Sequence, residues 1–262
     1  MYQIHRFFTQ ELQLESQNLL TGSQIRLNPH LENEIFFQLT KVLRIKIGHK
    51  IVLLPLKFAQ FNEQTAHKDY VFEVMESSKK ELVLKFLEIK ENGNELNFFL
   101  ELALCLPNNK NKLDFIIQKA VEIGIKKLSL ILSDFSQFKH QLALERIQKI
   151  ISEAAEQSER TELPTVESFQ NLSHYLDAQS DGLYVALERG ENRMNLLKNT
   201  FEFDKPVKIL IGPEGGFSEG ENQKIAAKNI PAFHLGKMIL RMETATISSL
   251  TAVALLNENI QK

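Results

Sequence analysis

The sequence of 262 residues contains a single cysteine, Cys105, and no tryptophan. One cysteine excludes an internal disulfide framework and any Cys-x-x-Cys metal or redox site. Because Cys105 lies in the apolar stretch LELALCL, we expect a buried and inert thiol. The seven histidines are scattered without a ligand-like spacing, so no metal site is expected.

Long apolar runs are also missing. No apolar stretch reaches the ~18 residues that span a bilayer, and the first residues, MYQIHRFFTQELQLES, lack the basic and apolar regions of a secretion signal. We therefore expect a cytoplasmic protein that does not associate with a membrane. With 43% hydrophobic residues, 24% charged residues and a net charge of −2, the composition is that of a globular protein of one or two domains.

The segment KVLRIKIGHKI (41–51) has the alternation of a half-buried strand. Ile45 and Ile47 alternate with charged neighbours up to Gly48, and Ile51 and Leu53 continue the alternation. A hairpin that turns at Gly48 is therefore predicted.

A second hairpin is predicted from arms around Phe72–Val74 and Leu82–Phe86, with a turn at 77–80. Residues 31–42 have helical spacing. Short antiparallel strands with one helix predict a small β-barrel-like domain over residues 1–90.

The polar segment KENGNE (Lys90–Glu95) is typical of a linker. Beyond it, strand-like and helix-like stretches alternate, which predicts a mainly parallel α/β sheet covered on both faces. The expected strands cover 96–106, 127–132, 182–187, 207–211 and the surroundings of Phe233. One expected helix begins with Asn111 as its N-cap, and a second covers 142–157. A third begins at Ser218, and a fourth begins near Glu243.

Two of the expected helices carry an apolar stripe at helical spacing. The stripes are Leu113, Ile116, Ile117, Ala120 and Val121 in the first, and Ile247, Leu250, Thr251, Ala254 and Leu255 in the last. We expect both stripes to be buried.

Glycine is scarce, yet five of the eleven glycines fall within 25 consecutive residues: Gly212, Gly215, Gly216, Gly220 and Gly236. The first group belongs to IGPEGGFSEGE (211–221), which follows the strand-like VKILI. Ser218 and Glu221 have the spacing of a capping box, so a helix begins there. A loop between a parallel strand and a helix is where α/β folds bind ligands, although a tight turn before a capped helix accounts for the same residues.

The loop is not a known nucleotide motif. Pro213 and Glu214 break the Gly-x-Gly-x-x-Gly spacing, and Glu221 stands where a P-loop requires lysine. The second group, LGKMILRMETATISSLTAVALL (235–256), places Arg241 and Glu243 before a helix. An ordinary ion pair and a favourable first-turn carboxylate would explain these two residues equally well.

Together, these strings resemble the ribosomal RNA small subunit methyltransferase E family, which belongs to the knotted SPOUT class. The resemblance covers essentially the whole chain. It is carried by HRFF (5–8), KVLRIKIGHKI (41–51), FIIQKAVEIGI (115–125), ISEAAEQSER (151–160), IGPEGGFSEGE (211–221) and LGKMILRMETA (235–245).

The resemblance implies a SPOUT-type α/β domain over residues 91–262, with a parallel sheet, a trefoil knot and a site for S-adenosylmethionine. It implies a PUA-like β-barrel domain over residues 1–90 that holds RNA. The family works as a homodimer on 16S rRNA within the small ribosomal subunit or its precursor. It methylates nitrogen 3 of a specific uridine, number 1498 in standard rRNA numbering.

Two other functions remain open from the sequence. One is a SPOUT methyltransferase that acts on tRNA or on another rRNA base. The other is a non-catalytic RNA-binding assembly factor.

The resemblance also implies roles for individual residues. Arg241 would stabilise the developing uridine anion, and Glu243 would accept the proton or orient Arg241. The residues implied for the cofactor are Leu187, Ile211, Gly212, Pro213, Gly215, Gly216, Leu235, Gly236, Met238, Ile239, Leu240 and Thr244. Those implied for RNA are Arg6, Arg44, Lys46, Lys110, Lys112 and Arg160, of which any single one could instead be a solvated surface residue.

The chain departs from the family in two places. In SDFSQF it has Phe135 where relatives carry an arginine, so an RNA or active-site contact is expected to be lost or supplied elsewhere. The stretch LPLKFAQFNEQTAHKDYVF is longer than the family's usual turn, so the RNA-facing edge of the small domain is expected to differ.

Overall fold

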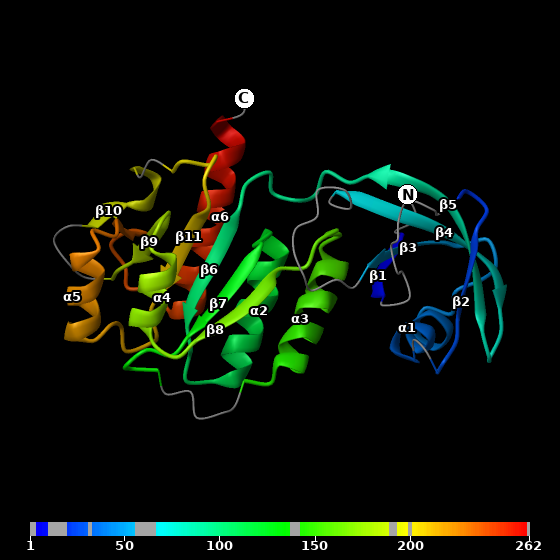
Figure 1. The fold of residues 1–262 in the computed structure, drawn as a ribbon, viewed down its shortest axis with the longest axis horizontal. Coiled ribbons are helices and arrows are strands. Elements are labelled where there is room, and N and C mark those ends of the chain that lie inside the picture. The colour runs from blue at the N-terminus through cyan, green and yellow to red at the C-terminus, as the bar shows by residue number, and fades with distance from the viewer. Residues whose placement is uncertain are drawn as a thin grey trace. The chain divides into compact units, whose positions relative to one another are not determined.

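The computed structural model describes residues 4–9, 20–30, 33–55, 67–136, 142–188, 193–198 and 201–260. The chain divides into two compact units (Figure 1). The first comprises residues 1–95 and 155–163, and the second comprises 96–154 and 164–262. Within the described part of the chain, no helix has the length and apolar character needed to cross a membrane.

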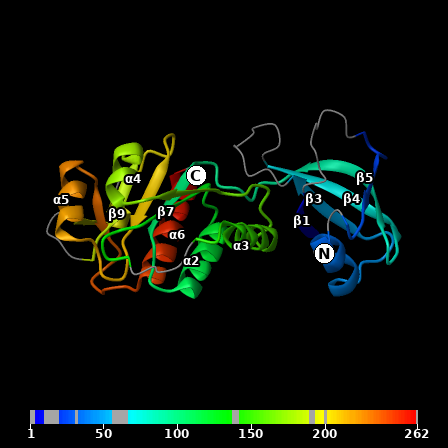
Figure 2. The ribbon, with the colours of Figure 1, turned by 60° about the horizontal axis from the view of Figure 1, so that its bottom comes forward.

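The first unit is built on a curled five-stranded mixed sheet (Figure 2). In spatial order its strands are β1 (His5–Thr9), β3 (Lys50–Pro55), β4 (Lys68–Ser77), β5 (Leu82–Glu91) and β2 (Gln24–Leu27), and only β1 and β3 pair in parallel. The helix α1 (Asn33–Phe37) continues into the π-helical turn η1 (Gln38–Val42), as the helical spacing predicted. Its Ile35, Phe36 and Leu39 are buried, so this helical segment contributes to the core of the unit.

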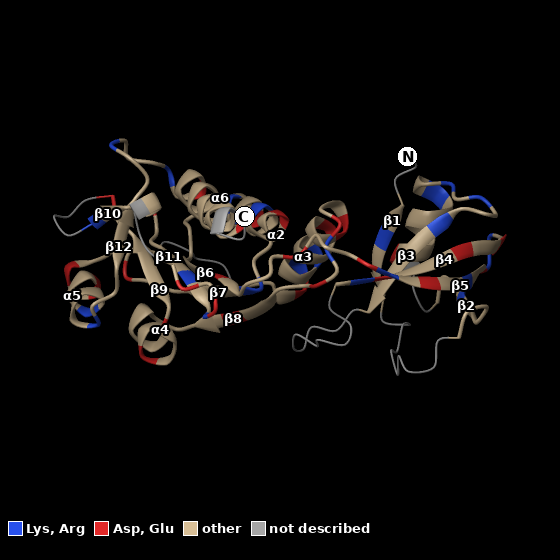
Figure 3. Ribbon diagram, turned by 90° about the horizontal axis from the view of Figure 1, so that it is seen from above, with Lys and Arg blue, Asp and Glu red and all other residues tan. Residues whose placement is uncertain are grey.

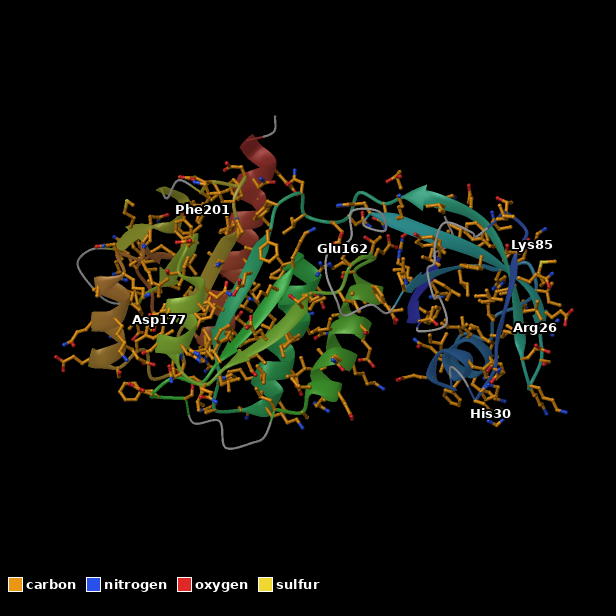
Figure 4. All side chains as sticks on the ribbon, in the orientation of Figure 1. Arg26, His30, Lys85, Glu162, Asp177 and Phe201 are labelled. Carbon is orange, nitrogen blue, oxygen red and sulfur yellow. The ribbon has the colours of Figure 1, made fainter. Side chains whose placement is uncertain are left out.

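The second predicted hairpin is confirmed. Phe72 of β4 lies opposite Phe86 of β5, with 5.4 Å between the ring centroids, and Val74 lies opposite Leu84. Figure 4 labels Lys85 in β5, which is opposite Gln24 of the outer strand β2.

The first predicted hairpin is wrong. No strand lies directly before Gly48, because η1 ends at Val42 and residues 43–48 turn irregularly, with a positive φ at Arg44 (49°) and at Gly48 (85°). Ile47 is 66% exposed, so the alternation did not mark a half-buried face. Only the second arm forms a strand, β3.

The predicted linker, residues 90–95, ends where the chain passes into the second unit, but polar contacts fix it within the first unit. Asn92 is buried, and its Nδ2 donates to Asp69 Oδ1 (3.0 Å) and to the carbonyl oxygen of Glu159 (3.2 Å). Glu95 is buried as well and is paired with Arg160. A polar composition therefore marked a buried hydrogen-bond network here.

The second unit contains a seven-stranded sheet in which every pairing is parallel, as the alternation predicted. Its spatial order is β10 (Arg193–Asn195), β12 (Ala232–His234), β9 (Leu183–Ala186), β11 (Val207–Ile211), β6 (Leu100–Cys105), β7 (Lys127–Ile131) and β8 (Thr165–Phe169). The sequence patterns did not predict β8 or β10, nor the helix α4 (Leu172–Gln179) and the short 3-10 turn η2 (Leu196–Lys198).

Helices cover both faces of this sheet (Figure 3). α2 (Lys110–Ile123), α6 (Met242–Ile260) and the part of α3 (Leu144–Gln157) within this unit lie on one face, and α4 and α5 (Glu219–Ala227) lie on the other. Asp177 of α4, labelled in Figure 4, pairs with Lys228 at the end of α5 (2.8 Å).

Helix α2 begins two residues earlier than the spacing predicted. Its N-cap is Asn109, not Asn111, and the Asn109 side chain accepts hydrogen bonds from the amides of Asn111 (2.8 Å) and Lys112 (3.3 Å). All five predicted apolar residues of this helix are buried. The cap therefore fixes the backbone at Lys112.

The predicted apolar face of α6 is right only in part. Leu250 and Ala254 are buried and Ile247 is half-buried, but Thr251 and Leu255 are exposed. Thr246 and Ser249 are buried instead. Their hydroxyls donate to carbonyl oxygens of the preceding turn, Thr246 to Met242 (2.8 Å) and Ser249 to Ala245 (2.7 Å). These local bonds satisfy the hydroxyls and so permit their burial.

Candidate functional site

Three neighbouring strands of the second unit end in one row. The register places Ile211 of β11 and Phe233 of β12 on either side of Ala186 of β9. Because the strands are parallel, the segments that follow all leave from the same edge of the sheet, where open α/β folds bind ligands.

These segments enclose a cavity of about 660 Å³. Eleven of the twelve residues predicted for the cofactor line it: Leu187, Ile211, Gly212, Pro213, Gly215, Gly216, Leu235, Gly236, Met238, Ile239 and Leu240. Arg241, Glu243 and Lys112 line it too. Thr244 does not; it lines a groove between α2 and α6, together with Phe115 and Ile247.

The glycines of the first loop serve close packing and a turn. At Gly212 a Cβ would lie 3.0 Å from the Phe217 ring, and Gly216 has a φ of 73°. The capping box is confirmed, since Ser218 Oγ accepts from the amide of Glu221 (3.2 Å) and Glu221 Oε2 accepts from that of Ser218 (2.9 Å).

Gly236 combines an unusual backbone with open space. Its φ is 132°, which L-residues rarely adopt, and no described heavy atom outside its chain neighbours lies within 4 Å of the place a Cβ would take. Its amide donates to His234 Nδ1 (3.1 Å). The second loop therefore exposes backbone to the cavity, where a side chain would occupy the space.

The cavity lining includes charges of both signs: Lys112, Arg193 and Arg241 against Glu188, Glu214 and Glu243. Sequence patterns missed Arg193, because β10 has only three residues and shows no usable periodicity. They also missed Glu188, which lies after the end of β9. Arg193 Nη1 donates to the carbonyl oxygens of Leu187 (3.2 Å) and Glu188. Glu214 was present in the motif, but its role was not predicted.

Lys112 joins two carboxylates at one wall of the cavity. Its Nζ lies 2.6 Å from Glu214 Oε1 and 3.8 Å from Glu243 Oε2. Burial tends to raise the pKa of Glu214, but hydrogen bonds from Lys112 and from backbone amides, that of Asn108 included, outweigh it and hold the pKa below its usual value. Glu214 is therefore a stable anion near neutral pH.

Arg241 and Glu243 do not pair with each other. Arg241 is exposed, and its guanidinium makes no hydrogen bond or ion pair with any described residue. Glu243 Oε2 is buried, with no hydrogen-bond partner among those residues. The cavity lining thus contains an unpaired cation, Arg241, and a carboxylate, Glu243, whose Oε2 is enclosed by protein without a hydrogen-bond donor among the described residues.

The six residues predicted for RNA fall into different settings. Arg44, Lys46 and Lys110 are exposed. Lys112 is engaged as described, and Arg6 is mostly buried between Asp69 and Glu159. Arg160 is 2% exposed and paired with Glu95, which leaves its side chain almost no surface for the predicted RNA contact.

Phe135, the departure from the family pattern, lies beside the first loop. A Cβ on Gly215 would lie 3.2 Å from Phe135 Cβ, and Phe135 is about half exposed. Its neighbour Asp134 is held to the helix that follows this loop, because its amide donates to Glu221 Oε1 (3.0 Å). The other departure lies largely in residues 56–66, outside the described residues.

Known proteins resemble this chain over most of its length. The model of the RNA methyltransferase domain family matches residues 94–254. The ribosomal RNA small subunit methyltransferase E of Mesomycoplasma hyopneumoniae (strain 232) is 30% identical and covers 95% of this chain and 98% of its own length. The protein of the same name from Helicobacter pylori (strain ATCC 700392 / 26695) is 31% identical and covers 83% and 90%.

Among solved structures, this chain is similar to the ribosomal RNA small subunit methyltransferase E of Neisseria gonorrhoeae bound to S-adenosyl methionine. The TM-score is 0.80, and the match covers 97% of this chain and 98% of that one, at 24% sequence identity. The likeness in fold therefore extends over nearly the full length of both proteins.

Proposed function

This chain belongs to the ribosomal RNA small subunit methyltransferase E family, and we propose that it transfers a methyl group from S-adenosylmethionine to nitrogen 3 of uridine 1498 in 16S rRNA. The observation that carries the proposal is the cavity at the ends of β9, β11 and β12. Its lining contains an unpaired arginine, a carboxylate oxygen without a hydrogen-bond donor among the described residues, and an apolar, glycine-containing loop.

The cavity suits S-adenosylmethionine in size and chemistry. Its volume of about 660 Å³ lies within the ~300–1,000 Å³ usual for small-molecule sites. Leu235, Ile239 and Leu240 offer apolar surface to adenine, and the open space at Gly236 lets the backbone reach its edge. Charges of both signs in the lining can receive the ammonium and carboxylate groups of the methionine part.

When bound, S-adenosylmethionine supplies an electrophilic methyl group. The protein has to hold the uracil ring in position and manage the proton on its imide nitrogen, since a neutral imide is a poor nucleophile. Glu243 Oε2 is a buried acceptor whose lone pairs are not used by the described residues, so it can take that proton. Arg241 can stabilise the negative charge that then develops on the uracil oxygens.

The remaining proposals concern architecture and partners. The first unit would be the PUA-like domain that holds RNA, with Arg44 and Lys46 on its surface, and the C-terminal region would form the trefoil knot. Phe115 of α2 and Leu255 of α6 are 43% and 52% exposed, which favours a homodimer that covers these helices. The enzyme would act in the cytoplasm and require no metal.

The test is methyl transfer with labelled S-adenosylmethionine, using either naked 16S rRNA or small subunits that lack the modification. A single 3-methyluridine at position 1498, formed much more slowly with Arg241→Ala, is the expected result. Label in tRNA or at another rRNA base would replace the substrate in this proposal. Absence of cofactor binding would overturn it in favour of a non-catalytic RNA-binding protein.

A further inference from the structure

Lys112 connects three segments that are far apart in the sequence. It lies in the first turn of α2, Glu214 in the loop after β11, and Glu243 in the first turn of α6. We propose that Lys112 is a positioning residue of the methyl-transfer site, which fixes Glu214 and keeps Glu243 free as an acceptor, and that it is not a phosphate contact. This inference rests on the proposed function.

The geometry divides the two carboxylates between two tasks. At 2.6 Å, Lys112 Nζ donates a hydrogen bond to Glu214, whose Oε2 also accepts from the Asn108 amide (3.2 Å). At 3.8 Å, the same Nζ is too far from Glu243 Oε2 for a hydrogen bond but close enough for electrostatic attraction. Glu243 therefore receives the field of a cation without losing its acceptor capacity.

Without Lys112, the site would hold two carboxylates with no cation between them. Glu214 would lose its hydrogen-bond donor, and Glu243 would lose the cation that lies 3.8 Å from its Oε2. A second consequence is mechanical, because the Gly215–Gly216 loop would lose its tie to α2 through Glu214. Both effects would reduce turnover without removing any contact to RNA.

Lys112 is also poorly placed for a phosphate. Its side chain is 24% exposed, and Asn109 caps the helix through the Lys112 amide. Lys110, two residues earlier, is exposed and has no ion pair with a described residue. The two lysines on the same helix turn thus offer a matched comparison of a half-buried, ion-paired lysine and an exposed one.

The experiment compares Lys112→Met, Lys112→Arg and Lys110→Met with the wild type on the 16S rRNA substrate. For Lys112→Met we expect kcat to fall about 100-fold, as misplacement of a reacting group does, with the KM for rRNA and the salt dependence of binding unchanged. Lys112→Arg should recover part of kcat. Lys110→Met should instead weaken RNA binding and lower the salt slope by about one.

A second readout does not depend on activity. Carboxyl carbon NMR titration of the ligand-free protein should show a higher Glu214 pKa in Lys112→Met and not in Lys110→Met. A missing shift, or a Lys112→Met variant that loses salt slope but keeps kcat, would overturn the role of Lys112. If the wild type bound the cofactor but methylated no 16S rRNA, while Lys112→Met still raised the Glu214 pKa, the proposed substrate would be wrong. The interaction of Lys112 with Glu214 would remain supported.

Discussion

Glu95 and Arg160, 65 residues apart in the sequence, form a buried ion pair within the first unit. Arg160 Nη2 lies 2.8 Å from Glu95 Oε2, and the two side chains are 2% and 0% exposed. Glu95 Oε1 accepts two further hydrogen bonds, from the amides of Thr161 (2.9 Å) and Glu162 (3.1 Å; Glu162 is labelled in Figure 4). The pair thus fastens residues 155–163 to the unit that begins the chain.

Breaking this pair from one side should destabilise the protein strongly. Arg160→Met leaves Glu95 buried without its cation, and Glu95→Gln leaves Arg160 without its anion; each should cost about 3–5 kcal/mol. The double variant should lose less than the sum of the two single losses, because the residues are coupled. Urea unfolding of the four proteins measures this, and additive losses would contradict the coupling.

The same ion pair should make the unfolding free energy of the protein depend on pH in the acidic range. Burial alone would raise the pKa of Glu95, but the charge and hydrogen bonds of Arg160 and two backbone amides outweigh it, so the pKa in the folded state is lowered. A lowered folded pKa means that the contribution is complete above the unfolded pKa and is lost as pH falls through the folded one. The difference in unfolding free energy between wild type and Glu95→Gln should therefore shrink below about pH 4.5; a constant difference down to pH 3 would contradict it.

The pair also shows what sequence patterns could and could not predict. Arg160 at the end of an amphipathic helix reads as a surface cation, and nothing in the local sequence indicates that Glu95 lies beside it. Local signals succeeded where the partners are close in sequence. β11 was predicted with its observed ends, and Ser218 and Glu221 form the predicted capping box, because both depend on neighbouring residues.

In the candidate site, too, features set by neighbouring residues were predicted and contacts between distant residues were not. The loops at 212–216 and 235–241 were predicted, since glycines and a strand end signal them locally, and they line one cavity. Arg193 was missed because its three-residue strand has no periodicity. The ion pairs of Lys112 were missed because its partners, Glu214 and Glu243, lie 102 and 131 positions away in the sequence. Thr246 and Ser249 misled the assignment of the α6 face, because their backbone hydrogen bonds let polar residues be buried.

Gly236 should be essential for cofactor affinity. Its φ of 132° strains any other residue, and a side chain there would enter the space at the cavity. Gly236→Val should abolish binding of S-adenosylmethionine, measured by calorimetry, in a protein that still folds. Gly220→Ala in the first turn of α5 is the control, because that helical position is exposed and tolerates a Cβ; wild-type affinity in Gly236→Val would exclude the loop as the contact.

Arg241 should act on the reaction more than on binding. Its guanidinium has no described partner in the protein, so Arg241→Ala should leave the melting temperature unchanged. Because the uracil anion exists only as the proton leaves, loss of a charge that stabilises it should lower kcat by about 100-fold to 1,000-fold. The affinity for S-adenosylmethionine should change much less.

Single-turnover methylation and cofactor titration on the same samples separate these effects. Arg241→Lys retains the charge but not the planar guanidinium, so it should retain more of the rate than the alanine variant does. If Arg241→Ala instead lost cofactor affinity and rate by the same factor, the arginine would bind the ground state, and the charge on uracil would have to be balanced by another group at the cavity. Lys112 is then the next cation to test, because it is the one already held beside Glu243.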